Sequence, residues 1–244
     1  MEAAGLAGFV VGASLPTVFL EHPELPVMKS TLGEYPMLRR VPLGIVLGAY
    51  IAGVVYLFGK RSGAHINPGV TWAFFRLGKI NFADAAFYTL AQFAGAVAAA
   101  QIMKFALGEF YADPPIRYVV TEPAKWDNSG IVALAAEFFI SFVLMFVCLV
   151  AANSRQFEKF VAPITGFLIA LYLMVETPYS GMSLNPARSF GSALAANEWQ
   201  YLWIYFVAPP LAMLAAAEIF LRLKPLLSGL IDKEQPSYPN YEEN

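Results

Sequence analysis

The chain has 244 residues, of which 58% are hydrophobic and 14% are charged, and its mean hydropathy is +0.55. A soluble domain averages roughly 45–50% apolar and about 25% charged residues, so this composition excludes disorder and argues against a soluble domain. The formal net charge of −2 offers no basic surface for nucleic acid. One cysteine and two histidines cannot form an internal disulfide or a metal-ligand cluster. The composition therefore predicts a polytopic membrane protein, and we expect no metal or other cofactor.

Six apolar stretches are candidates for helices that cross a bilayer, whose hydrocarbon core of about 30 Å requires about 20 residues of helix. In chain order they are Ala3–Leu20, Pro42–Phe58, Asp84–Leu107, Gly130–Ala152, Phe160–Thr177 and Tyr201–Leu223. Small residues recur in the second and third stretches, which favours helices that pack closely in a bundle. These small residues are Gly44, Gly48, Gly53, Ala91, Gly95, Ala98 and Ala99.

The Lys and Arg residues are distributed unequally over the two sides of these six spans. Nine lie on one side and six on the other, and Arg188 within the membrane region completes the total of 16. Because short loops rich in Lys and Arg stay in the cytoplasm, we expect the N-terminus and the C-terminus to be cytoplasmic. The tail 224–244 is polar and rich in proline and acidic residues, and we expect it to be disordered. The nine are Lys60, Arg61, Arg76, Lys79, Arg155, Lys159, Arg222, Lys224 and Lys233.

One motif occurs twice in the chain. Residues 62–71 read SGAHINPGVT and residues 180–189 read SGMSLNPARS, so Ser-Gly, three variable residues and Asn-Pro recur. A single Asn-Pro pair is weak evidence because it is a common turn opener, but here each half of the chain has one copy and three spans. Three spans per half make the halves inverted, an architecture that puts the functional site near the membrane midplane. We expect inverted repeats at about 1–115 and 129–223 within a single domain, 1–223.

Each Asn-Pro pair predicts the start of a short helix, because Asn is a favoured N-cap and Pro suits the first helical turn. The two helices, about Gly69–Gly78 and Ala187–Ala196, would each cover about 15 Å, half of the membrane core. If they meet end to end, their first amide groups point at the midplane, where each N-terminus carries about half a positive charge. Arg188 follows the second pair directly and is a functional candidate, since a charge at membrane depth is costly.

The paired Asn-Pro boxes in two inverted halves resemble the major intrinsic protein family, the aquaporins and glycerol facilitators, over nearly the whole chain. The second box, NPARSFGSA at 185–193, is close to the family pattern, whereas the first has Gly69 where alanine is usual. The missing methyl loosens a helix start by about 1 kcal/mol and is expected to widen the contact between the half-helices slightly. The resemblance implies an all-α membrane fold of six transmembrane helices plus two half-helices. It also implies a homotetramer in the lipid bilayer of the cell (inner) membrane, as in prokaryotic members.

The resemblance further implies roles for individual residues. The two boxes, whose asparagine amides would donate hydrogen bonds to passing water, are Asn67, Pro68 and Gly69, and Asn185, Pro186 and Ala187. The outer constriction, which would act as the selectivity filter, is formed by Leu47, Leu173, Met182 and Arg188. Glu2 and Glu137 would be structural acceptors for loop amides, and His65 would line the inner vestibule.

The residues that bear on selectivity point in two directions. A constriction with three apolar members and one arginine favours small uncharged solutes, as in a glycerol facilitator. Later positions instead resemble the water branch of the family: Ser189, Ala193, Tyr205 and Phe206. The resemblance therefore implies a passive water channel that excludes protons and ions, with a facilitator of glycerol or other small neutral solutes as the alternative.

Two other classes of membrane protein remain open at this point. An ion-coupled transporter also uses inverted repeats with broken helices, but it normally needs acids at midplane depth for coupling. In a closed structural membrane protein, the boxes would only pack the fold. The sequence has no nucleophile elbow, phosphate loop or metal cluster, so we expect no enzyme. Three further charged residues near span ends are expected to be interfacial: Lys104, Glu176 and Glu218.

Overall fold

The computed structural model describes residues 1–226, so the predicted tail lies outside the described residues from residue 227 onward. The six long helices are α1 (Glu2–Glu21), α2 (Pro36–Ser62), α4 (Phe82–Leu107), α6 (Ile131–Ala152), α7 (Val161–Val175) and α10 (Leu202–Leu223). The two half-helices are α3 (Pro68–Arg76) and α9 (Pro186–Ala196). The remaining turns of helix are η1 (Thr31–Glu34), α5 (Glu109–Ala112), η2 (Arg117–Val119), η3 (Glu158–Phe160) and α8 (Thr177–Ser180). Residues 1–226 contain no strand, which confirms the all-α prediction.

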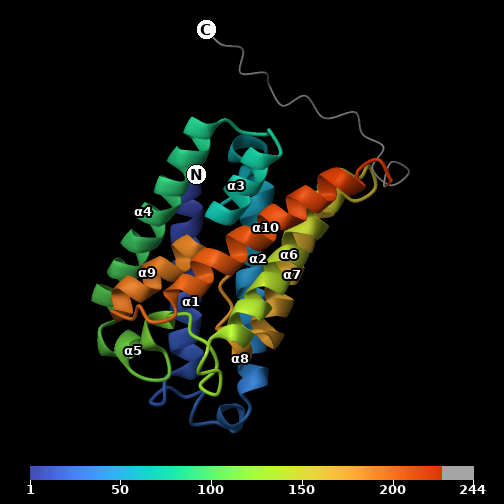
Figure 1. Cartoon of the computed structure of the whole chain (residues 1–244). Coiled ribbons are helices and arrows are strands. Elements are labelled where there is room, and N and C mark those ends of the chain that lie inside the picture. Colours follow the sequence, from blue (N-terminus) through green and yellow to red (C-terminus); the bar gives the residue numbers. More distant parts are fainter. Residues whose placement is uncertain (227–244) are drawn as a thin grey trace.

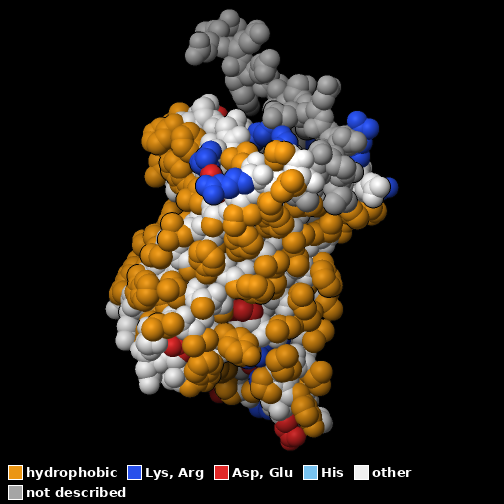
Figure 2. All heavy atoms as spheres, turned by 45° about the vertical axis from the view of Figure 1, so that its right-hand side comes forward, with side chains coloured by type: hydrophobic (Ala, Val, Ile, Leu, Met, Phe, Trp, Pro, Cys, Tyr) orange, Lys and Arg blue, Asp and Glu red, His pale blue; other side chains and the backbone are white. Residues whose placement is uncertain are grey.

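Six helices among the described residues are long and apolar enough to cross a membrane, as predicted, the fifth being Glu158–Val175 with η3 included. Hydrophobic side chains cover the middle of the molecular surface in Figure 2, and Lys and Arg side chains gather toward its upper end. The predicted second span, Pro42–Phe58, was too short at both ends because basic residues flank its apolar centre. The helix instead begins at Pro36, whose ring suits the first turn, and ends where Gly63 adopts φ +79°.

The helix contacts repeat between the two halves of the chain. Helix α1 contacts α4 as α6 contacts α10, and α4 contacts α9 as α10 contacts α3. Helices α2 and α7 occupy equivalent positions and contact each other. This pattern pairs α1, α2, α3 and α4 with α6, α7, α9 and α10 in that order. The contacts are those expected of the predicted inverted repeats.

Helices α2 and α7 can approach closely because both have glycine at their contact. A Cβ atom on Gly48 would overlap the carbonyl oxygen of Gly166, and a Cβ atom on Gly166 would overlap the carbonyl oxygen of Gly48. Gly44 also faces α7, whereas nothing lies within 4 Å of a Cβ added to Gly53. The predicted role of small residues in close packing therefore applies to Gly44 and Gly48 but not to Gly53.

The bundle has two ends, which we name by what they carry. The terminal face carries the start of α1 and the end of α10, at the top of Figure 1, and the loop face at the bottom carries residues 22–35 and 113–130. At the terminal face Glu218 forms ion pairs with Arg76 and Arg222, so α3 and α10 are joined there. The half-helices α3 and α9 enter from opposite faces and contact each other inside the bundle.

Candidate functional site

The two half-helices begin in the same way, with asparagine as the cap and proline as the first helical residue. The Oδ1 atom of Asn67 accepts a hydrogen bond from the amide of Gly69 at 2.8 Å. The Oδ1 atom of Asn185 accepts from the amides of Ala187 at 3.0 Å and Arg188 at 3.2 Å. Each cap fixes its own side chain, because satisfying the first helical amides leaves the asparagine NH₂ group pointing away from its helix.

The two asparagines also join the two re-entrant loops, residues 63–67 and 181–185, which precede the half-helices. Nδ2 of Asn67 donates to the carbonyl of Leu184 at 2.7 Å, and Nδ2 of Asn185 donates to the carbonyl of Ile66 at 2.8 Å. Those carbonyls are available because Ile66 and Leu184 adopt positive φ angles of 40° and 61°, an uncommon conformation for such residues. An asparagine amide carries two N–H donors, so each side chain retains one N–H that these contacts leave unused.

Glu2 holds the first re-entrant loop from behind. Its Oε1 accepts from the hydroxyl of Ser62 at 2.8 Å and the amide of His65 at 3.2 Å. Its Oε2 accepts from the amide of Ile66 at 2.6 Å and from Nε2 of Gln92 at 2.8 Å. Both carboxylate oxygens are therefore occupied, and this buried acid is bonded only to neutral donors among the described residues.

Glu137 holds the second loop with the same geometry. Its Oε1 accepts from the hydroxyl of Ser180 at 2.7 Å and the amide of Ser183 at 2.6 Å, and its Oε2 accepts from the amide of Leu184 at 2.8 Å. Ser62 and Ser180 are the serines that open the two copies of the sequence motif. The repeated Ser-Gly thus has a physical reason: its hydroxyl and the loop amides share one buried carboxylate.

The space left by the missing methyl of Gly69 is filled. A Cβ atom at this position would lie 2.8 Å from Sδ of Met213 and 3.4 Å from Cα of Pro210, both on α10. Met213 is fully buried. Met213 therefore packs against the first box and occupies the space in which we expected a slight widening of the contact between the half-helices.

Two cavities approach the asparagines from opposite faces. The terminal-side cavity measures about 160 Å³ and extends from Ala152 and Val161 to both asparagines and Met182. The loop-side cavity measures about 290 Å³ and extends from Pro36 and Glu21 inward to Met182 and Arg188. The terminal-side cavity is mostly apolar: its aliphatic lining includes Leu6, Ile51, Val55, Leu144, Leu149 and Ile169. His65 also lines this cavity, where its Nδ1 lies 3.2 Å from the hydroxyl of Thr71.

The four residues predicted for the outer constriction all line the loop-side cavity: Leu47, Leu173, Met182 and Arg188. They come from α2, α7, the second re-entrant loop and α9. Arg188 is only 7% exposed, and its NH1 donates to the carbonyl of Val119 at 2.9 Å and the hydroxyl of Ser192 at 3.2 Å. These contacts use one terminal nitrogen, so the guanidinium keeps further donors for the cavity that it lines.

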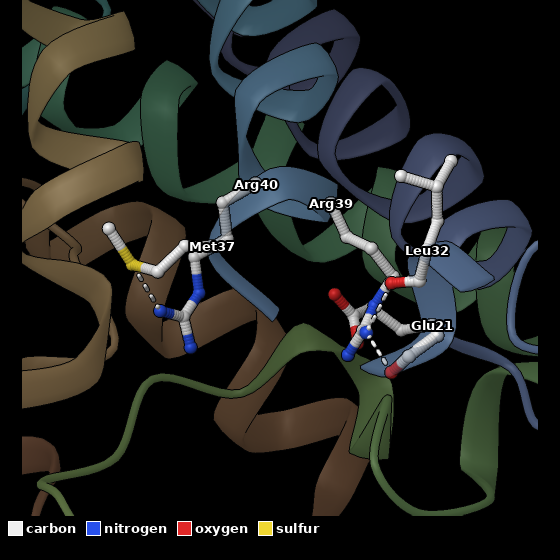
Figure 3. Close-up of polar contacts among 6 residues, drawn as sticks. Glu21, Leu32, Met37, Arg39 and Arg40 are labelled. Carbon is white, nitrogen blue, oxygen red and sulfur yellow. Dashed lines mark hydrogen bonds and ion pairs between the residues drawn. The ribbon is translucent and has the colours of Figure 1, made fainter. Parts of the chain in front are cut away.

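Two more arginines line the outer part of this cavity, and Figure 3 shows that they differ in their partners. Arg39 is buried and forms an ion pair with Glu21 at 2.9 Å, and it also donates to the carbonyls of Leu32 and Gly33. Arg40 lies on the other side of the helix turn, with NH1 3.5 Å from Sδ of Met37. Both belong to the six Lys and Arg residues opposite the nine on the predicted cytoplasmic side, and through its bonds to Leu32 and Gly33 Arg39 holds the segment 22–35 against the mouth of the cavity.

Of the charged residues expected to be interfacial, Lys104 makes a specific backbone contact and Glu176 is buried. Lys104 donates to the carbonyl of Ala195 at 2.7 Å, which satisfies the last turn of α9. Glu176, one residue beyond the span Glu158–Val175, is 6% exposed, and neither of its carboxylate oxygens has a hydrogen-bond partner among the described residues. Burial, together with the nearby charge of Glu137, raises the pKa of Glu176 to about 8. Hydropathy could not predict this burial, since a glutamate at a span end usually faces water.

The residues resembling the water branch support the second loop and α9. The hydroxyl of Ser189 lies 2.8 Å from that of Thr121 and 2.5 Å from that of Ser183, and Tyr205 donates to the carbonyl of Ser180. Ala193 is buried, while Phe206 is 41% exposed and packs against Phe190. These four residues lie beside the cavities and are absent from their linings.

Comparison with known proteins yields a family, sequence relatives and a similar solved structure. The family model described as "Major intrinsic protein" matches residues 13–220. The chain is 33% identical over 227 residues to Aquaporin-4 from Rattus norvegicus, covering 84% of this chain and 66% of that protein. It is 36% identical over 168 residues to Aquaporin NIP1-4 from Oryza sativa subsp. japonica, covering 68% of this chain and 59% of that protein. The chain thus spans between 59% and 66% of the length of these relatives.

The fold is shared with a solved structure described as the X-ray structure of the aquaglyceroporin from Plasmodium falciparum. The TM-score is 0.75 at 19% sequence identity, and the match covers 93% of this chain and 96% of that chain. Together with the family model that spans residues 13–220, this agreement leads to one conclusion. The chain belongs to the major intrinsic protein family.

Proposed function

We propose that the chain forms a passive transmembrane channel whose main permeant is water. The observation that carries this proposal is that two cavities enter from opposite faces and share Phe9 and Met182, and that the terminal-side cavity reaches Asn67 and Asn185. Each asparagine keeps a free N–H donor at that point, while the surrounding wall is largely aliphatic. A wall of this kind holds a water molecule weakly except at the two amides, which favours fast passage.

The electrostatics of the same site favour exclusion of protons and cations. The N-termini of α3 and α9 both point at the asparagines, and each carries about half a positive charge. Arg188 adds a full positive charge on the loop side. A water whose oxygen accepts from both amides has its own hydrogens turned away, so it cannot pass a proton along the file.

A facilitator of glycerol or similar small uncharged solutes is the second candidate function. The observation that favours it is the composition of the outer ring, in which Leu47, Leu173 and Met182 can contact alkyl groups while Arg188 can donate to a hydroxyl. The relative named Aquaporin-4 supports the first candidate by its name, and the solved aquaglyceroporin supports the second only through its fold.

The surroundings of the channel follow from the charge distribution and the family. We propose that the terminal face is cytoplasmic, because eight of the nine basic residues assigned to that side lie in the described chain, at or near the terminal-face ends of the helices. Location in the cell membrane and assembly as a homotetramer are proposed from family membership. Protease accessibility of the C-terminus in oriented vesicles tests the orientation, and the mass of the purified protein tests the assembly.

Stopped-flow light scattering on proteoliposomes tests the channel. An impermeant osmolyte such as sucrose should shrink proteoliposomes faster than protein-free liposomes, and re-swelling in a glycerol gradient should be slow. Fast re-swelling would favour the second candidate, and no acceleration of either shrinkage or re-swelling would refute both.

A pair of matched variants on α2 shows whether the flow uses the cavities. Leu47→Trp fills the loop-side cavity, since Leu47 is 1% exposed and lines it, and should abolish the accelerated shrinkage. Ile45→Trp makes the same change two residues away at a 57% exposed position, and should leave shrinkage fast. Equal rates in the two variants would contradict flow through this path.

A further inference from the structure

The two cavities share only two lining residues, Phe9 and Met182. The asparagines line only the terminal-side cavity, and Arg188 lines only the loop-side cavity. The two cavities therefore meet at Phe9 of α1 and Met182 of the second loop, beside the predicted outer ring to which Met182 belongs. The resemblance assigned no role to any residue of α1 in the channel lining.

Helix α1 contributes one continuous stripe to this path. Leu6 lines the terminal-side cavity, Phe9 lines both cavities, and Ala13 lines the loop-side cavity. Residues three and four apart share a face of a helix, and the seven steps along the helix from Leu6 to Ala13 rise about 10 Å. Within this stripe the bulkiest side chain, Phe9, lies where the two cavities meet, and the smallest, Ala13, lines the larger loop-side cavity.

The ring of Phe9 is held in place from α2. It packs against the ring of Tyr50 with centroids 6.5 Å apart, and the hydroxyl of Tyr50 donates to the carbonyl of Gly5 at 2.8 Å. A Cβ atom on Gly8 would overlap the Tyr50 hydroxyl, so Tyr50 lies directly against the α1 backbone. A side chain fixed on its helix and against a second ring cannot swing aside as freely as the long aliphatic chain of Met182.

We propose that Phe9 is a specificity-determining residue, which forms with Met182 an apolar constriction that limits the size and hydroxyl content of solutes. A solute at this point loses hydrogen-bond partners, because neither side chain offers any, and unpaired hydroxyl groups are costly in an apolar setting. A water molecule keeps its neighbours above and below in the file. A polyol must align several hydroxyl groups past the same point, so the constriction acts against it.

This inference rests on the proposed function and adds to it the class of solute that is rejected: linear polyols of glycerol size and above. It also gives a reason for the slow glycerol passage that we expect, although three of the four residues of the outer ring are apolar. In the outer ring Leu47, Leu173 and Met182 can contact the alkyl part of a polyol and Arg188 can donate to one hydroxyl, whereas Phe9 offers the remaining hydroxyl groups no partner.

The test measures the ratio of glycerol to water permeability in proteoliposomes for the full chain and three variants. Phe9→Ala should raise this ratio by about tenfold, the scale on which a few methylene groups change discrimination in an apolar pocket. Phe9→Leu, which keeps most of the bulk, should give a smaller rise. The matched control is Phe19→Ala, the same change on the same helix at a position that is 57% exposed, and its ratio should equal that of the unchanged chain.

The outcomes separate this inference from the function on which it rests. If Phe9→Ala and Phe9→Leu conduct water rapidly with an unchanged glycerol ratio, the role of Phe9 is refuted while the water channel stands. If the unchanged chain conducts no water above protein-free liposomes, the proposed function itself fails. If Phe9→Ala does not fold, Phe9→Leu decides, because a folded variant is recognised by its rapid water flow.

Discussion

The glycine of the first box offers a quantitative check on the packing of the half-helices. Replacing Gly69 by Ala adds a methyl that would lie 2.8 Å from Sδ of Met213, whereas carbon contacts are optimal at roughly 3.5–4.0 Å. The sulfur must therefore move by about 1 Å in a fully buried site. Overpacking of this kind typically costs about 1–3 kcal/mol, and the better helix propensity of alanine returns at most about 1 kcal/mol. We expect Gly69→Ala to lower stability by about 1 kcal/mol.

A double-mutant cycle with Met213→Ala tests whether overlap of the added methyl with Met213 causes this loss of stability. Met213→Ala alone should cost about 2–5 kcal/mol, because it opens a cavity beside Gly69. The added methyl of Gly69→Ala should then occupy part of that cavity, so the double variant should be more stable than the sum of single effects by about 0.5–3 kcal/mol.

Unfolding of the purified protein in mixed detergent micelles, followed by circular dichroism, measures all four corners of the cycle. For a chain of this length, a loss of 1 kcal/mol lowers the melting temperature by about 2–4 °C. Effects that add within about 0.3–0.5 kcal/mol would refute the contact between the methyl and Met213.

Two further variants probe charge. Arg188→Val removes a cation from the loop-side cavity. Two unit positive charges about 4 Å apart repel each other by about 4 kcal/mol at an effective dielectric constant of about 20, so Arg188 opposes a permeating proton on this scale. Proton leak into liposomes carrying a pH-sensitive dye should therefore rise at least about tenfold. The control Arg117→Val, at a residue outside the cavity lining, should leave the leak unchanged. Equal leaks in the two variants would refute the role of Arg188 as a barrier to protons. Glu176→Gln should raise the melting temperature above pH 8 and have little effect near pH 4, because the pKa of Glu176 is raised to about 8. The folded state retains a proton that the unfolded state releases above its ordinary pKa of about 4.3, so stability is lost as pH rises from about 4 to 8. A pH dependence of melting that is the same in both proteins would show that Glu176 ionises normally.

The spans and the half-helices were predictable because their causes are local. An apolar run of helical length and an Asn-Pro cap act through the residues next to them in the chain, and the caps at Asn67 and Asn185 form as the motif predicts. The fold class and the six spans were confirmed on this basis. The contacts of Glu2 and Glu137 are long-range, and only the repeated Ser-Gly could have hinted at two equivalent acceptors.

The features that the sequence did not reveal depend on which helix face meets which neighbour. Met213 fills the space beside Gly69 from α10, and Glu176 is buried although its neighbours in the chain mark a span end. Phe9 carried a weak signal, since it lies seven residues after Glu2 and residues seven apart share a helix face. Nothing in a single sequence says that this face is turned to a cavity rather than to lipid.

The difference between the two halves of the channel comes from side chains on one shared backbone. Ala64 and Met182 hold equivalent places, three residues before their asparagines, and both adopt a φ of 48°. Ala64 lines the terminal-side cavity alone, while Met182 lines both cavities, as Phe9 of α1 does. An inverted repeat with identical side chains would narrow both sides of the asparagines equally. A small residue in the first loop and a long one in the second place the constriction on the loop side only, before a solute reaches the two amides.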